Sequence, residues 1–337
     1  MRGLRDVDAL YNPHYGYFSK HAVIFETAQP FDFTDMKDEM EFQNRLAVEY
    51  TRFEDKLDQE DPNPVRQLWH TPTELFKPFY GEAIARYLVT NYKLSLFPYN
   101  DLVIYEMGAG NGTMMVNVLD YIRSSDPDVY DCTKYKVIEI SEPLARLQRK
   151  KAEERGHLDK IEIVNKSIFE WDTYVPDPVF FLALEVFDNF AHDMIRYDPE
   201  TEVPHQGIVL CDQDGDFHDF YTPLLDPVAE RFLRVRQYVV RSSYAHPLNT
   251  PKILRKIRGL LPGASNLTVP EYIPTKAMQF FDVLREQFPA HRLVMSDFNR
   301  LPDSVKGVNS PVVQTRYNRE TIPVTTPFVS ISLARES

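Results

Sequence analysis

The chain has 337 residues and a formal net charge of −12, with 43% hydrophobic and 26% charged residues. The 22 Phe and 19 Tyr exclude a wholly disordered chain, and the two cysteines are too few for a disulfide scaffold or a Cys-rich metal site. The acidic balance argues against broad nucleic-acid binding. The longest apolar run, residues 179–184, is too short for a membrane span.

Residues 1–98 predict an N-terminal arm with helices. Residues 35–59 have apolar side chains at helical spacing and many acids, which favours a helix with a solvated face over a cation site. Thr71, Pro72 and Glu74 have the pattern of a capping box. They predict a second helix that runs to about residue 91.

Residues 99–204 alternate between strand-like and helix-like segments. The strands are predicted at 101–107, 135–140, 161–165 and 179–184, and the helices at 112–124 and 142–155. This alternation predicts a parallel sheet in a doubly wound, Rossmann-like α/β fold.

Residues 205–290 are less regular and predict an insertion of mixed α and β structure. A hairpin is expected to turn at Asp214 and Gly215, and helices are expected at 226–241, 249–261 and 276–288. The middle helix is basic, which indicates either a solvated face or a contact with an acidic partner. Residues 291–337 are expected to return to the sheet with a strand at 292–298 and to end in a hairpin.

Three of the twelve glycines lie within five residues, directly after the first predicted strand. The segment is Gly108-Ala109-Gly110-Asn111-Gly112, with Glu106 two residues before it. A dinucleotide fingerprint would need a third glycine at position 113, which is threonine. The spacing is that of S-adenosylmethionine (SAM) methyltransferases, in which the loop wraps the amino-acid tail. Glu106 is then placed to orient the ammonium group.

Polar side chains also follow the next two strands. Glu139 and Ser141 end the second strand, and a carboxylate there suits the two ribose hydroxyls. Asn165 and Ser167 end the third, where a polar group can meet the adenine edge while Ile168 packs on the adenine face. Ligands of open α/β sheets bind at these strand ends. The sequence therefore predicts one SAM site built from three strand tips.

At this point the chain resembles the MidA family of SAM-dependent methyltransferases. The matching segments are ALYNPHYGYF (9–18), TPTELFKPFYGEAIA (71–85), EMGAGNGTMM (106–115), YKVIEISEPLARLQ (135–148) and ALEVFDNFAHD (183–193). The resemblance implies a class I methyltransferase fold and a mitochondrial type II protein arginine methyltransferase that forms symmetric dimethylarginine. It implies, as the protein substrate, an arginine of a respiratory complex I subunit.

Some segments depart from the family pattern. Leu184 replaces an asparagine, and an acidic helix near residues 35–60 replaces a shorter Gly-rich connection. The family continues beyond residue 325, so the last strands of the sheet are expected to be missing from this chain. Residues 1–10 have no pattern of a transit peptide, since Asp6 and Asp8 intervene.

An arginine substrate stays protonated in water and calls for carboxylates beside the methyl donor. Glu185 and Asp188 follow the fourth strand and are expected to bind the guanidinium, and His192 to accept the proton. Structural roles as a cap or surface residue compete for Glu185 and His192.

Three more residues are placed on the substrate side. Glu74 matches a Pro-Glu segment of the family, although its capping role competes. Tyr15 and Tyr17 belong to an aromatic segment that either walls the cofactor pocket or packs as part of the arm. No metal is required for methyl transfer.

Two other functions remain open. A non-catalytic assembly factor would keep the SAM fold, and a methyltransferase of a small molecule or RNA would keep the cofactor site. A homodimer is compatible with each of these.

Overall fold

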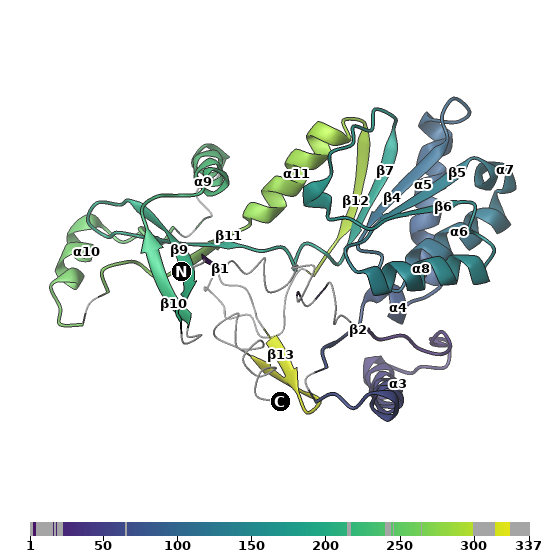
Figure 1. Ribbon diagram of the computed structural model, residues 1–337, viewed down its shortest axis with the longest axis horizontal. Coiled ribbons are helices and arrows are strands. Elements are labelled where there is room, and N and C mark those ends of the chain that lie inside the picture. Colours follow the sequence, from purple (N-terminus) through teal and green to yellow (C-terminus); the bar gives the residue numbers. More distant parts are fainter. Residues whose placement is uncertain are drawn as a thin grey trace.

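The computed structural model describes residues 3–4, 16, 18, 23–64, 66–213, 217–239, 244, 246–263, 265–298 and 314–323. Two five-stranded sheets lie beside each other along the long axis of the molecule (Figure 1). Among the helices so described, none is long and apolar enough to cross a membrane.

The central sheet is parallel throughout, with the order β12-β7-β4-β5-β6. Its strands are β4 (Leu102–Met107), β5 (Thr133–Ile138), β6 (Ile161–Val164), β7 (Val179–Leu184) and β12 (His291–Ser296). Ile104 and Phe180 pack into the core on one face, and their neighbours Tyr105 and Phe181 pack on the other. Because both faces are buried, the strands are apolar at nearly every position. The predicted α/β fold and the strand near residue 292 are confirmed.

Helices cover both faces of this sheet (Figure 1). On one side lie α5 (Phe79–Ser95), α6 (Thr113–Ser125) and α8 (Glu142–Glu154), on a core that includes Leu88, Leu119 and Ala152. On the other side lies α11 (Thr275–Gln287). Phe280 of this helix and Phe288, directly after its end, pack against the sheet. The short helices α7 (Pro127–Asp131) and η1 (Ile168–Glu170) complete the crossovers.

The prediction of one continuous helix from residue 71 to about residue 91 was wrong. The chain forms α4 (Pro72–Leu75), breaks, and starts again with α5 at Phe79. Pro78 has no N–H and its ring obstructs the preceding turn, so the helix cannot run through it. The expected cap at the start is present, since the Thr71 side chain accepts from the Glu74 N–H at 3.4 Å.

The second sheet is antiparallel, and all its strands except β1 lie between β7 and α11 in the chain. Its strands are β1 (Gly3–Leu4), β8 (Asp193–Tyr197), β9 (Pro204–Cys211), β10 (Phe217–Thr222) and β11 (Glu271–Ile273). The hairpin β9–β10 confirms the predicted pairing, whereas its turn at 214–216 lies outside the described residues. The helices α9 (Pro227–Val239) and α10 (Lys252–Gly259) follow it. Division of the chain at residues 98, 204 and 290 stays a prediction. β8 begins before residue 204 and belongs to the second sheet, whereas α11 ends before residue 290 and packs on the central sheet.

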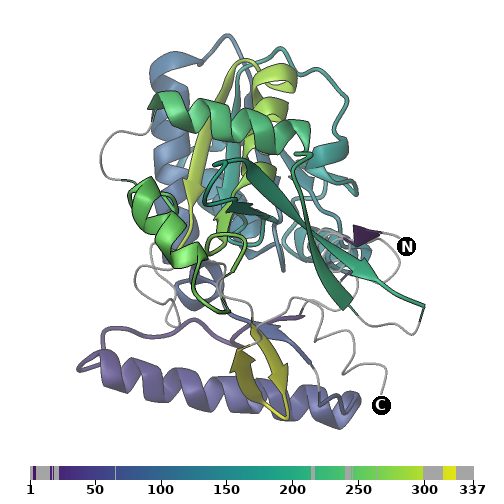
Figure 2. The same ribbon diagram turned by 90° about the vertical axis from the view of Figure 1, so that its left-hand side faces the viewer.

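The N-terminal arm contains α3 (Glu39–Glu60) and a parallel pair, β2 (Val23–Ile24) and β3 (Leu68–Trp69). The C-terminal hairpin of β13 (Gln314–Tyr317) and β14 (Glu320–Pro323) lies on α3 (Figure 2). Arg316 donates two hydrogen bonds to the carboxylate of Glu54, and Arg319 pairs with Asp55 and Asp58. The acidic face of α3, expected to be solvated, is thus partly neutralised by the hairpin.

Candidate active site

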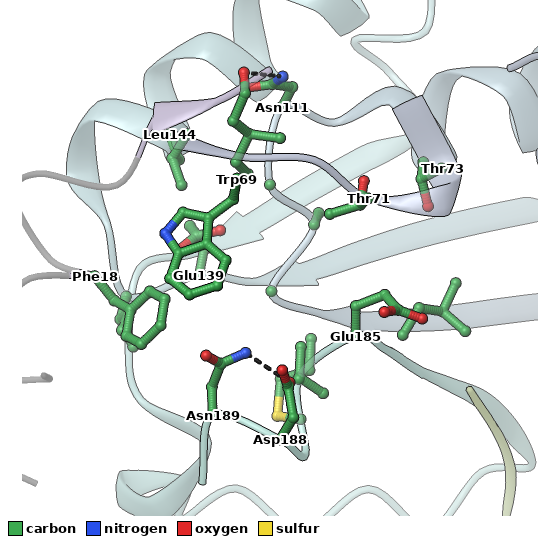
Figure 3. A pocket seen from close by; sticks show the side chains of 18 of the residues that line it. Phe18, Trp69, Thr71, Thr73, Asn111, Glu139, Leu144, Glu185, Asp188 and Asn189 are labelled. Atoms are coloured by element: carbon green, nitrogen blue, oxygen red, sulfur yellow. Dashed lines mark hydrogen bonds between the residues drawn. The ribbon is translucent and has the colours of Figure 1, made fainter. Parts of the chain in front are cut away.

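A cavity of about 510 Å³ lies at the carboxyl ends of β4, β5 and β7 (Figure 3). The predicted site residues that line it are Glu74, Glu106, Gly108, Ala109, Gly110, Asn111, Glu139, Ser167, Ile168, Glu185 and Asp188. Those that do not line it are Gly112, Ser141, Asn165 and His192. Tyr15 and Tyr17 lie outside the described residues.

The glycine loop turns sharply between β4 and α6. Gly108, Gly110 and Gly112 have φ values of 68°, 53° and 79°, which side chains disfavour. A Cβ on Gly110 would lie 2.7 Å from Cδ1 of Ile24 in the N-terminal arm. Gly112 is the N-cap residue of α6. The loop therefore needs glycine both for its dihedral angles and for the close approach of the arm.

Replacing Gly110 with alanine is expected to weaken SAM binding about tenfold or more. The left-handed conformation costs a residue with a Cβ roughly 1–2 kcal/mol, and the contact with Ile24 adds to this cost. Calorimetric titration with SAM measures the effect. Gly259→Ala is the matched control, because a Cβ there meets nothing within 4 Å. Equal affinities for the two variants would contradict this role of the loop.

Glu106 is buried at the cavity wall near the end of β4. The Tyr135 hydroxyl donates to Oε2 at 2.7 Å. Burial, and to a lesser degree the nearby Glu139 charge, raises the pKa of Glu106 to about 7. A bound ammonium group would favour the ionised carboxylate again. The geometry suits the amino-acid tail of a ligand.

Glu139 is buried one residue after β5. Its carboxylate accepts from the Ser141 N–H at 2.9 Å and from Gln148 Nε2 at 3.0 Å. Gln148 Nε2 also donates to the Gly110 carbonyl at 2.8 Å, which ties the glycine loop to this carboxylate. Burial raises the pKa of Glu139. Hydroxyl groups of a bound sugar would supply further donors.

Ser141 and Asn165 support the strand tips. The Ser141 hydroxyl caps α8 by accepting from the Leu144 N–H at 3.5 Å. The Asn165 amide donates to the backbone carbonyl of Glu139 at 2.7 Å. A direct contact of either residue with the cofactor stays a prediction.

Glu74 joins the N-terminal arm to the glycine loop. Its Oε1 accepts from Thr113 Oγ1 at 2.7 Å and from Asn111 Nδ2 at 3.1 Å. Lys77 lies 3.4 Å from Oε2, and it also contacts Glu26. The side chain is 2% exposed. Glu74 therefore braces the loop, and its place on the substrate side stays a prediction. Among the described residues only the Thr71 half of the capping box is present.

Three carboxylates meet at one end of the cavity region. Glu185 directly follows β7 with a φ of 56°, a strained value for a side chain of its size. Ser296 Oγ donates to its Oε1 at 3.4 Å. Its Oε2 is buried and has no hydrogen-bond partner within the described part of the chain. Such an atom lacks the cation or donor that would normally compensate its burial.

Asp188 and Asp297 complete this acid cluster. Burial first, and then the Asp297 and Asp188 charges, raise the pKa of Glu185 to about 7. Burial, followed by the Asp297 charge, raises the pKa of Asp188 to about 6. The cluster therefore concentrates negative charge where a cation would be stabilised. No group of three His, Cys, Asp or Glu residues in the described ranges is arranged to hold a metal.

Asp297 was not identified from the sequence. Its Oδ2 accepts from the backbone N–H groups of Phe187 at 2.7 Å and of Asp188 at 3.2 Å, and so holds the loop that carries both acids. The available signal was an acid near the end of the strand predicted at residues 292–298.

His192 does not line the cavity. Its Nδ1 contacts the Phe190 carbonyl at 2.8 Å, and burial lowers its pKa. Proton acceptance by His192 stays a prediction.

Aromatic residues form the opposite end of the cavity. Phe18 and Trp69 line it with ring centroids 6.4 Å apart, and Figure 3 shows them together, away from Glu185. Trp69 was missed by sequence reasoning, because a short segment between two helices gives no signal of a wall.

The cavity fits SAM, the ligand that the glycine loop predicts. Gly108, Gly110, Glu106, Glu139, Ser167 and Ile168 all line it. Their assignment to the amino-acid tail, the ribose and the adenine of SAM stays a prediction. Position 110 has no room for a side chain, so only glycine fits there.

Comparisons with known proteins support SAM as the cofactor. The model of a family described as "Putative S-adenosyl-L-methionine-dependent methyltransferase" matches residues 83–333. A Schizosaccharomyces pombe protein named "Protein arginine methyltransferase NDUFAF7 homolog, mitochondrial" is 26% identical over 257 residues, which are 72% of this chain and 53% of that protein. A Saccharomyces cerevisiae protein of the same name is 22% identical over 232 residues, which are 66% of this chain and 51% of that one.

The chain thus spans about half the length of the curated relatives it matches. A crystal structure of a Burkholderia thailandensis protein bound to S-adenosyl-homocysteine aligns with a TM-score of 0.45 and 16% identity, over 71% of this chain and 49% of that one. SAM is the cofactor of the matched family. Because the family model covers well over half of the chain, this protein belongs to the MidA family of SAM-dependent methyltransferases.

Proposed function

We propose that this protein transfers a methyl group from SAM to an arginine side chain of a protein. The observation that carries the proposal is the acid cluster beside the cofactor cavity, with the buried, unpaired Glu185 Oε2. A guanidinium is planar and always charged in water, and it binds carboxylates through paired N–H groups. The cluster supplies the negative charge and the open acceptor that such a side chain requires.

Bound SAM supplies an electrophilic methyl carbon. The residues of the chain orient the acceptor: Glu185 and Asp188 bind the guanidinium and align one nitrogen, while Phe18 and Trp69 shield the cavity from water. Glu185 Oε2 can then hold the proton that the nitrogen gives up, because the pKa of Glu185 is about 7.

Three finer features of the proposal rest on resemblance to the two yeast relatives. Both are named as mitochondrial protein arginine methyltransferases. We propose the same compartment for this chain. From the resemblance to the family we also propose symmetric dimethylarginine as the product and an arginine of a respiratory complex I subunit as the substrate.

Incubation with methyl-labelled SAM and mitochondrial protein, followed by acid hydrolysis and amino-acid analysis, tests this function. We expect label in symmetric dimethylarginine. Label in RNA or in a small molecule would refute the protein substrate. SAM binding without any transfer would favour the non-catalytic assembly factor.

A further inference from the structure

The helix α10 is attached to the second sheet through its polar side. Arg255, in the middle of the helix, is 8% exposed. Its guanidinium donates to the Leu248 carbonyl at 2.7 Å and pairs with Glu202. Since an arginine occupies the inward position, the aliphatic residues of the helix face outward.

Five aliphatic side chains form this outward surface, which we name the α10 face. They are Ile253 (75% exposed), Leu254 (49%), Ile257 (55%), Leu260 (79%) and Leu261 (60%). Amphipathic helices of soluble domains normally turn such residues toward the core. A contiguous exposed apolar surface of this kind marks an interaction site.

The chain segment that contains the α10 face is strongly basic. Residues 227–263 contain eight Lys or Arg and one Glu, a net charge of +7 in a chain of net charge −12. Arg231, Arg236 and Arg255 pair with acids of the same fold. Among the described residues, no ion pair involves the exposed Lys252, Lys256, Arg258 or Arg234.

The position of α10 in the molecule favours one kind of partner over the others. It lies at one extreme of the long axis, while the acidic helix α3 lies toward the other side of the molecule (Figure 1). The α10 face is therefore a protruding tip. Interfacial helices bury aliphatic residues below the lipid headgroups while neighbouring cations meet anionic lipids. A nucleic acid would use the cations alone, and a symmetric second copy would bring two basic faces together.

We infer that the α10 face docks this protein on the surface of an anionic membrane. Ile253, Ile257 and Leu260 enter the headgroup region, and Lys252, Lys256 and Arg258 contact the lipid phosphates. The contact is peripheral and independent of methyl transfer.

Co-sedimentation of the full chain with phosphatidylcholine vesicles, with and without phosphatidylserine, tests this inference. We expect binding to the anionic vesicles only. Lys256→Glu should weaken it about fivefold or more, since one cation near the surface contributes roughly 1 kcal/mol. The pair Leu260→Ser and Leu261→Ser should weaken it about tenfold or more.

Matched controls are Leu94→Ser on α5, with a side chain 80% exposed, and the exposed Arg149→Glu on α8. Both should bind vesicles like the unaltered chain. Thermal unfolding confirms that each variant is folded. The inference is wrong if anionic vesicles do not bind, or if the controls lose as much binding as the α10 variants. It is also wrong if the α10 substitutions instead abolish a dimer or a complex with an acidic protein.

Discussion

Replacing Glu185 with glutamine is expected to lower kcat/KM for methyl transfer to arginine by about 10²–10³-fold, while SAM binding stays unchanged. Glutamine keeps the shape of the side chain but removes its negative charge. The guanidinium then loses a charge-assisted hydrogen bond in a buried place, and Oε2 loses its capacity to hold the proton. Transfer assays with labelled SAM give the rate, and calorimetric titration gives the SAM affinity.

The exposed Glu154→Gln on α8 is the matched control, because it makes the same chemical change away from the cavity. It should transfer methyl groups like the unaltered chain. If Glu185→Gln lost SAM affinity and rate together, the carboxylate would belong to the cofactor site. If the rate did not change, the guanidinium would be bound elsewhere.

The parallel central sheet and its strands could be predicted because their signals are local. Apolar runs near residues 102 and 179 are long enough to identify strands buried on both faces, and polar residues follow them. The cavity accordingly contains Glu106, Glu139 and Glu185, each named from its place at a strand end. Parallel strands bring such ends together, so spacing along the chain was sufficient.

Contacts between distant segments were beyond such reasoning. Glu74 matched a local capping pattern, yet its carboxylate bonds to Asn111 and Thr113, more than thirty positions away. The sequence predicted that the acids of α3 form a solvated face. In the structure Arg316, which lies far away in the sequence, binds Glu54. Hydrophobic periodicity identifies α10 as a helix but does not state which side faces inward. There, a single ion pair of Arg255 outweighs the usual preference.

Asp297 illustrates the same limit within the site. Its place in the sequence, near the end of the strand predicted at residues 292–298, is visible. Its role depends on β12 lying beside β7, which sets the register Ser296–Leu184 and brings the following residues together. Only this pairing shows that Asp297 holds the loop of Glu185 and Asp188.

Replacing Asp297 with asparagine is expected to shift the pH dependence of methyl transfer to lower pH. Burial is the largest cause that raises the pKa of Glu185 to about 7 and the pKa of Asp188 to about 6, and the Asp297 charge is the second. Both acids bind a guanidinium in their ionised form, so kcat/KM should rise as pH increases through 6 to 7. Without the third charge both carboxyls ionise more readily, and this rising limb moves down.

The size and the direction of the change in the pH profile distinguish the loss of the Asp297 charge from general damage to the loop. We expect the limb to move by roughly one pH unit, as one like charge at close range allows. The plateau of kcat/KM should fall about tenfold, because the amide accepts the Phe187 and Asp188 N–H groups less strongly. Asp159→Asn, at an exposed position, is the control and should leave the profile in place. A lower plateau with an unmoved limb would mean that Asp297 only stabilises the loop. A limb moved to higher pH would contradict the assignment of the ionised acids as the working form.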